Sequence, residues 1–574
     1  MRTRPVGTRA RWLRLLAVLA VLGLLTAGCG GGSSSGGDDD AQDDGGQTGS
    51  TAAGGDDDGG DEGDEAAGEP TPGGKVVYAL EAESTGGFCL YGAQLAISGI
   101  MVTQSIYDTL TVPNEDGEYV PYLAESIEPN DTFDTWVITL RDGVTFHNGE
   151  PLDAEAVKLN LDSYRGANPD AFAPLFTFVF QNIADVQVTG PLEVTVTTAT
   201  PWPAFPAYLF SSGRLGIMAP EQIADTEGCS RNLIGTGPFQ LDEWVPNDHL
   251  SATKFADYWR ADEGLPYLDE IEFRPVTDGG QRVNGLETGA FQAMHSSGAQ
   301  EILDLRDMAE NGQANLEESS DGAEVGYTLL NDARAPFDDL TARQAVAYAV
   351  SEEELNELIN DGLNPLANGP MAPGTQGFAE DTGYPTSDPD RARELVQEYK
   401  DAHGGQFAFE LTWSGTDPNT RQLAEEAAQQ LREVGIDVTV KNTADQSQFI
   451  NDALGGNFDA FIWRNHGGTE GDLLYVWFHS GSPVNFSKFT DPEIDRLLDE
   501  GRTEIDPDRR DEIYLELNRR FGEQVWELWS WYTVWGIATS ADVHGILGPE
   551  LPDGSMPFPL LAGWHLTSGL WVEQ

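Results

Sequence analysis

Alternating apolar and polar residues mark the first half of the chain as rich in β-strands. Within residues 134–141, three apolar side chains fall on one face of an extended chain: Trp136, Ile138 and Leu140. This period of two predicts a half-buried strand. Asp142-Gly143 then turns the chain into residues 144–146, so the pattern predicts a β-hairpin.

Helical signals become stronger in the second half. Ser351 and Glu354 have the spacing of a capping box ahead of an apolar stretch. Asp388-Pro389 has the residue types that open a helix. Residues 491–504 and 506–524 predict two further helices in succession.

Residues 408–441 combine both kinds of pattern. They predict a strand over 409–413, a helix over 420–434 that Gly435 ends, and a strand over 436–440. A strand, a helix and a strand in this order form a βαβ unit with two parallel strands. The chain is therefore predicted to belong to the α/β class. No long linker interrupts residues 75–574.

The N-terminus carries the features of an export signal. Five arginines precede a short apolar run over 15–25: Arg2, Arg4, Arg9, Arg11 and Arg14. The run is too short to span a bilayer, so residues 1–28 are interpreted as a signal peptide. Small residues lead into Cys29 and resemble a bacterial lipobox, which implies a lipid on this cysteine. The alternative is an ordinary signal peptide with an incidental cysteine.

Charge defines the segment after the signal. Residues 30–74 hold 13 acidic residues and no basic residue among many Gly and Ser, so 29–74 is expected to form a disordered tether. The whole chain has 96 acidic against 32 basic residues, and 75–574 keeps 83 against 27. Such a surface disfavours nucleic-acid binding and suits a salty exterior. The mature protein is therefore expected outside the cell, lipid-anchored to the membrane or in a periplasm.

Two cysteines remain after Cys29. Cys89 and Cys229 are expected to form a disulfide, because an exported protein meets an oxidising compartment. Two buried thiols are the alternative.

Several enzyme signatures are missing from the sequence. It contains no His-Glu-x-x-His zinc motif, no Gly-x-Ser-x-Gly elbow and no phosphate-binding loop with lysine. No catalytic residues, metal or cofactor are therefore predicted. A secreted hydrolase with a carboxylate pair stays open as an alternative, because an acidic chain always offers such pairs.

Ordered sequence blocks resemble the bacterial solute-binding family for oligopeptides, dipeptides and nickel. The blocks are residues 122–126, 136–149, 151–152, 235–239, 258–259, 267–271, 337–346 and 486–498. The resemblance extends over essentially all of 75–574.

The resemblance implies a two-lobed periplasmic-binding-protein-like fold whose lobes close over a solute. Its first lobe would comprise 75–118, 230–325 and 536–574, its second lobe 326–535, and an extra subdomain over 119–229 would be inserted in the first. The implied partners are a peptide or other small solute and the permease of an ABC importer with separate ATPase subunits. The receptor would be a monomer. A sensory receptor without transport is a further alternative.

One block departs from the family pattern. Peptide-binding relatives have an Asp three residues after a Trp, and this Asp pairs with the ammonium group of the peptide. Here the Trp is Trp463 and the Asp position holds His466, with Arg464 nearby. Arg464 could bind a carboxylate, a phosphate or sugar hydroxyls, and Trp463 could stack on the solute. Core packing of Trp463 and pairing of Arg464 with an acid are the alternatives.

Three other aromatic residues are candidate solute contacts. Trp413 ends the first strand of the βαβ unit, where carboxyl ends of parallel strands face a cleft. Phe88 and Tyr91 lie in a loop after the first strand that the resemblance brings to the cleft. Core packing is again the alternative.

Overall fold

The computed structural model describes residues 68–574, except 85, 94, 174–175, 416–417, 444–445 and 466. The expected signal peptide over 1–28, the lipid site at Cys29, most of the tether over 29–74 and His466 lie outside the described residues. In the part that is described, no helix has the length and apolar character to cross a membrane.

A seven-stranded mixed sheet forms the centre of the first lobe. β1 runs parallel to both β10 and β11, and the remaining neighbours are antiparallel. In spatial order the strands are β12 (Ala314–Ser319), β18 (Trp535–Ser540), β11 (Ala293–Ser296), β1 (Lys75–Leu80), β10 (Glu270–Pro275), β9 (His249–Lys254) and β8 (Phe239–Val245). The helices of this lobe are α1 (Ile97–Ile106), α5 (Pro220–Ala224), α6 (Gly279–Glu287) and α7 (Ala299–Glu310).

A five-stranded sheet forms the centre of the second lobe. In spatial order the strands are β15 (Asp437–Thr443), β14 (Ala408–Ser414), β16 (Ala460–Asn465), β13 (Val325–Leu330) and β17 (Glu527–Tyr532). β14 is parallel to β15 and β16, so the predicted βαβ unit is correct, with α11 (Pro418–Glu433) as its helix.

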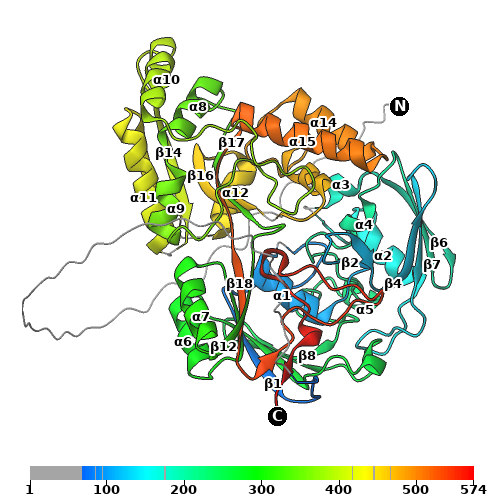
Figure 1. Ribbon diagram of the computed structural model, residues 1–574. Helices are drawn as coiled ribbons and strands as arrows, with labels where there is room; N and C mark the ends of the chain where they lie inside the picture. The colour runs from blue at the N-terminus through cyan, green and yellow to red at the C-terminus, as the bar shows by residue number, and fades with distance from the viewer. Residues whose placement is uncertain are drawn as a thin grey trace, which may run out of the picture. The chain divides into compact units, whose positions relative to one another are not determined.

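Helices cover both faces of this five-stranded sheet (Figure 1). One face packs against α8 (Leu340–Ala349), α9 (Glu352–Asn360), α10 (Pro389–Ala402) and α11. The other packs against α12 (Gln446–Gly455), α13 (Tyr475–Phe478), α14 (Pro492–Thr503) and α15 (Pro507–Gln524). The helices predicted over 491–504 and 506–524 are therefore confirmed.

The helix starts follow the predicted capping chemistry only in part. Ser351 accepts a hydrogen bond from the N–H of Glu354 at 3.2 Å, as a capping box requires. The N–H of Ser351 donates instead to the side chain of Gln430 at 2.8 Å, so the reciprocal half of the box is replaced by a contact with α11. Asp388 accepts from two N–H groups of α10, which confirms that helix start.

A four-stranded antiparallel sheet lies between β3 and β8 in the sequence. Its strands, in spatial order, are β4 (Ala124–Pro129), β5 (Thr135–Leu140), β7 (Glu193–Thr198) and β6 (Ile183–Gly190). Its helices are α2 (Ala154–Tyr164), α3 (Thr177–Phe180) and α4 (Phe205–Tyr208). Two separate two-stranded sheets pair β2 (Thr111–Pro113) with β3 (Tyr119–Pro121), and β19 (Val543–His544) with β20 (Trp571–Val572).

The predicted strand at 136–140 is confirmed as β5, but the predicted hairpin is wrong. Both edges of β5 are already paired, with β4 on one side and β7 on the other. Residues 144–146 therefore do not pair with β5, and Thr145 makes a single bridge to Pro151 instead. Because β4 and β7 pair with its two edges, β5 has no edge left for a local hairpin.

The chain passes between the two large sheets twice. It leaves β12 for β13 across residues 320–324, and it leaves β17 for β18 across residues 533–534 (Figure 1). The N–H of Thr533 donates to the backbone oxygen of Glu324 at 2.9 Å, so the two crossing segments are hydrogen-bonded to each other.

A buried ion pair joins the second lobe to the segment of α4. Arg502 of α14 approaches Asp472 at 3.0 Å, and the Asp472 side chain is fully buried. The indole N–H of Trp202 donates to the same carboxylate at 2.8 Å, and the Tyr208 hydroxyl donates to the backbone oxygen of Asp472 at 2.5 Å. Charged and aromatic groups from distant parts of the sequence thus meet in one buried contact.

Cys89 and Cys229, the pair expected from the sequence, are joined by a disulfide with Cα atoms 5.1 Å apart.

Candidate functional site

Segments from both lobes meet beside the carboxyl ends of parallel strands. Glu81 follows β1 and Ser297 follows β11 in the first lobe. Arg464 lies near the end of β16 in the second lobe. In open α/β sheets, ligands bind in a crevice at such strand ends. This junction is therefore the candidate solute site.

Arg464 reaches from the second lobe to the first. Its Nη1 lies 3.4 Å from the Ser297 hydroxyl and 3.6 Å from a carboxylate oxygen of Glu324. Its guanidinium carbon is 5.9 Å from the ring centre of Trp535, the first residue of β18. Yet 49% of the side chain is exposed. Both polar contacts use the same guanidinium nitrogen, Nη1.

Glu324 connects this arginine to a second one. Glu324 is fully buried in a crossing segment. Its charge raises the pKa of Arg464 above the ordinary arginine value. Burial lowers the pKa of Arg214 to about 10, and Glu324 opposes that decrease. Both guanidinium groups therefore remain cationic at neutral pH, with one buried carboxylate acting on both.

Glu81 fixes the loop that carries Ser297. Its carboxylate accepts a hydrogen bond from the Ser297 N–H at 3.1 Å and lies 3.6 Å from Nη2 of Arg282. Arg282 itself donates to the backbone oxygen of Val276 and to the hydroxyl of Ser296. The position of Ser297 is thus determined by strand ends and buried polar contacts.

A small cavity of about 20 Å³ lies where residues 176–214 face residues 467–477. Its polar lining includes Ser211, Ser212 and Arg214, and its other walls include Gly467 and Trp477. The Ser212 hydroxyl donates across the cavity edge to the backbone oxygen of Gly467 at 3.3 Å. This volume accommodates about one water-sized polar group.

An unusual turn presents Arg214 to this cavity. Ser211, Ser212 and Gly213 have φ values of 46°, 55° and 77°, three left-handed residues in succession. For serine this conformation costs about 1 kcal/mol or more. Arg214 follows the turn, is 6% exposed, and donates from Nε and Nη2 to the backbone oxygen of Leu95 at 3.3 and 3.1 Å.

Strand alternation separates the two neighbours that the sequence singled out. Arg464 and Trp463 project to opposite faces of β16. Trp463 packs on the α12 side, with its ring centre 5.4 Å from Phe449 and 5.2 Å from Phe486. It is half-buried in that cluster rather than directed toward Ser297 and Glu324. His466 lies outside the described residues.

The other three candidate aromatics are buried in the packing of their own lobes. Trp413 is 6% exposed and belongs to the core between the five-stranded sheet and its helices α8, α10 and α11. Phe88 is 1% exposed and its ring centre lies 5.1 Å from Trp244. Tyr91 is 8% exposed in the core of the first lobe. The structure does not bring these three rings to Arg464.

Sequence reasoning did not identify Glu324, Ser297 or Arg214. Each lies far from Arg464 along the chain, so no local spacing connects them. Two features of the sequence could have pointed to Arg214. It is a basic residue in a chain with 96 acidic and 32 basic residues, and it directly follows Ser-Ser-Gly, whose residue types favour a turn.

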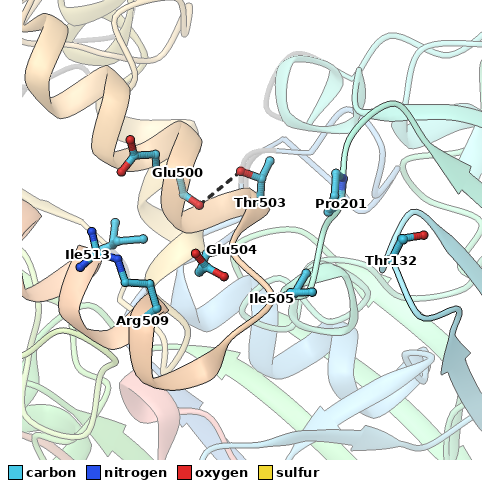
Figure 2. Close-up of a pocket in the computed structure, with 8 residues that line it drawn as sticks. All are labelled: Thr132, Pro201, Glu500, Thr503, Glu504, Ile505, Arg509 and Ile513. Carbon is cyan, nitrogen blue, oxygen red and sulfur yellow. Dashed lines mark hydrogen bonds between the residues drawn. The ribbon is translucent and has the colours of Figure 1, made fainter.

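A larger groove of about 310 Å³ lies elsewhere, between the four-stranded sheet's loops and the α14–α15 connection. Figure 2 shows Thr132 and Pro201 facing Ile505 across it. Two of its charged residues have ion-pair partners: Glu500 pairs with Arg496 at 2.5 Å and Arg509 with Glu512 at 2.7 Å. The lining of this groove does not include Arg464, Ser297 or Glu324.

Comparisons with known proteins agree on one family. Residues 118–486 match the model of the bacterial extracellular solute-binding proteins, family 5 (middle region). The chain is 32% identical over 337 residues to the glutathione-binding protein GsiB of Salmonella paratyphi A, which is 58% of this chain and 63% of that protein. It is 31% identical over 340 residues to GsiB of Pectobacterium atrosepticum, or 59% of this chain and 64% of that protein. The matches thus span somewhat less than two thirds of these relatives.

Solved structures show the same fold at lower identity. AgaA from A. tumefacien R10, in complex with agropinic acid, superposes with a TM-score of 0.76 at 24% identity, covering 87% of this chain and 99% of AgaA. The oligopeptide-binding protein AppA of Bacillus subtilis, in complex with a nonapeptide, gives 0.75 at 19% identity, covering 88% of this chain and all of AppA. The fold is therefore the two-lobed α/β fold of periplasmic binding proteins, and the chain belongs to family 5 of the bacterial extracellular solute-binding proteins.

Proposed function

We propose that this protein is the substrate-binding receptor of an ABC importer, which captures a peptide or another small polar solute between its lobes and delivers it to a membrane permease. Membership of the solute-binding family supports this function. The observation that carries it is Arg464, a half-exposed cation of one lobe that contacts Ser297 and Glu324 of the other. A solute bound there would touch both lobes at once.

The lobes proposed to move comprise 75–118, 230–325 and 536–574 on one side and 326–535 on the other, with 119–229 inserted in the first. A solute that binds the closed arrangement more tightly than the open one shifts the population toward closure. Arg464 and His466 are the proposed solute contacts. Trp463, Trp413, Phe88 and Tyr91 are assigned to the packing that supports them, because of their burial.

The receptor is proposed to act outside the cell as a monomer, held to the membrane through a lipid on Cys29 and the acidic segment 29–74. Membrane-spanning and ATP-hydrolysing subunits would be separate chains. Intact mass spectrometry of the mature protein checks the anchor: a mass with diacylglycerol on Cys29 is expected, and an unmodified cysteine would remove this part of the proposal.

Native mass spectrometry of the purified protein tests the receptor function, followed by release and identification of any bound molecule. We expect one small polar molecule per chain, and small-angle scattering should show a smaller radius of gyration with that molecule than without it. Arg464→Ala should weaken its binding, whereas Arg306→Ala should not, because Arg306 is a surface residue paired with Glu318. Turnover of the bound molecule by the protein would favour the hydrolase alternative.

A further inference from the structure

A further cavity, of about 50 Å³, lies within the second lobe. Its walls are the five-stranded sheet and the helices α8, α9 and α11. Among the described residues, the first lobe contributes nothing to this lining. Protein interiors are close-packed, and gaps larger than a water molecule are few. A cavity of this size in the core of one lobe is therefore a candidate binding site.

The lining of this cavity combines apolar and polar side chains. The apolar walls include Leu355 of α9 and Ile462 of β16. The polar side chains include Glu352, the first residue of α9, with Thr328 of β13 and Ser530 of β17. Because β13 and β17 are neighbours in the sheet, their two hydroxyls line the same cavity as the carboxyl group. Such a lining suits an apolar molecule with one polar end.

Glu352 has an oxygen that the protein leaves unsatisfied. Its Oε2 is buried and forms no hydrogen bond within the described part of the chain. Burial raises the pKa of Glu352 to about 8, and a contact with Ser530 opposes this increase. No cation of the described residues adds to that opposition. Since buried acids are normally hydrogen-bonded or paired, the free oxygen points to a ligand that supplies a donor.

A primary ammonium group matches the polar side of the cavity. It has three N–H donors and no acceptor, and the cavity offers acceptors on Glu352, Thr328 and Ser530. A volume of about 50 Å³ accommodates about four water-sized groups, which corresponds to one nitrogen and three carbons. The formal charge of −64 also concentrates cations around the protein. An anion, in contrast, would meet an acid and no compensating cation.

We propose that this cavity binds a primary alkylammonium group of about three carbons, with its nitrogen at Glu352 and its carbons against the apolar lining. The site is separate from the junction at Arg464 and does not rest on the receptor function. On binding, Glu352 releases its proton to the solvent, and the resulting carboxylate pairs with the ammonium. The ammonium belongs either to a free amine or to a side chain of a longer molecule.

Calorimetry with propylamine and propanol tests the proposal, because the two molecules differ only in the polar end. The mature protein is used in about 1 M sodium chloride, which screens its exposed acids. At about pH 7, propylamine should bind about tenfold or more tightly than propanol. Binding should release nearly one proton, measured in buffers of different ionisation enthalpy. The affinity for propylamine should rise about tenfold per pH unit up to about pH 8 and then level off.

Variants locate the effect. Glu352→Gln should remove both the proton release and the preference for propylamine over propanol. Glu353→Gln is the matched control, because Glu353 is the next residue of α9 and is exposed. Ala427→Leu places a larger side chain into the cavity from α11 and should abolish binding of both probes. This variant carries the test if Glu352→Gln fails to fold.

A pair of tripeptides identifies the source of the ammonium. If Ala-Lys-Ala binds more tightly than Ala-norleucine-Ala, and Glu352→Gln removes the difference, a side chain of a longer molecule supplies it. If only propylamine binds through Glu352, the ligand is a free amine.

Three outcomes would overturn the ammonium proposal. They are propanol binding as tightly as propylamine, a preference for propylamine that survives Glu352→Gln, and a cavity that binds neither probe and holds only water. None of them would count against the receptor function, because that function was argued from Arg464 and the first lobe.

Discussion

Buried carboxylates away from the solute site make stability depend on pH at the level of single residues. Glu527 is fully buried at the start of β17, where it accepts hydrogen bonds from the N–H of Leu330 and the hydroxyl of Ser487. Burial raises the pKa of Glu527 well above its usual range, and it does the same for the nearby Asp332. Folding therefore favours the protonated form of both acids.

Glu527→Gln should stabilise the protein at high pH. A carboxyl group whose pKa is raised on folding loses stability as pH rises from its unfolded pKa toward its folded one, by about 1.4 kcal/mol per pH unit. Glutamine keeps the hydrogen-bonding shape without this loss. The melting temperature of the variant should exceed that of the parent at about pH 8 and by much less at about pH 4.

Thermal unfolding at the two pH values checks this expectation, with the exposed Glu523→Gln as control. An equal shift at both pH values would show that Glu527 acts through packing rather than through its proton.

At the same scale, the sequence singled out Arg464 as a candidate because it lies beside His466, which stands where the family pattern has an Asp. Its alternation with Trp463 was also visible, since neighbours on a strand point to opposite faces. Which face would be open was not visible, because that depends on α12 covering one face and the first lobe approaching the other. Arg214 could not be identified from the sequence for a similar reason. It lies 250 positions from Arg464, and only the tertiary structure brings both residues near Glu324.

Helices and strands could be predicted from the sequence where contacts between residues close in the chain determine them. The βαβ unit, α14 and α15 were predictable because their apolar periodicity and caps are local. The hairpin after β5 was not, because β4 and β7 occupy both of its edges. Edge pairing is a property of the sheet and not of the turn sequence.

The incomplete capping box of α9 gives a prediction at this scale. Ser351→Ala should destabilise the protein by about 1 kcal/mol, because it removes the acceptor for the N–H of Glu354. Glu354→Ala should have a smaller effect, since the N–H of Ser351 is satisfied by Gln430. Urea unfolding of both variants measures the difference. A larger loss from Glu354→Ala would mean that the acid has a capping role after all.

The buried ion pair between Arg502 of α14 and Asp472 gives a further prediction at this scale. Arg502→Met leaves the buried Asp472 without its cation and should destabilise the protein by about 3–5 kcal/mol. Arg496→Met, on the same helix but 39% exposed, should cost about 1 kcal/mol or less.

Adding Asp472→Asn to Arg502→Met separates charge from packing. The double variant should regain part of the lost stability, because no buried charge is then left unpaired. Urea unfolding compares the three variants. A double variant less stable than Arg502→Met would show that the contact with Trp202 and Tyr208 depends on the carboxylate itself.

On the scale of the whole molecule, a formal charge of −64 should make folding sensitive to salt. Self-repulsion destabilises a compact, highly charged state. Raising sodium chloride from about 0.01 M to about 1 M shortens the screening length from about 30 Å to about 3 Å, so the melting temperature should rise. Differential scanning calorimetry measures this, and a melting temperature that stays constant or falls would contradict a role for repulsion.

The Cys89–Cys229 disulfide links positions on either side of the four-stranded sheet and its helices. A protease that cuts once anywhere in residues 90–228 therefore leaves two pieces that remain one covalent molecule. Such a nicked protein would migrate as a single band on a denaturing gel without reductant and as two bands with it. Outside the cell, where proteases are common and no ribosome can replace the chain, damage in this region would not release a fragment.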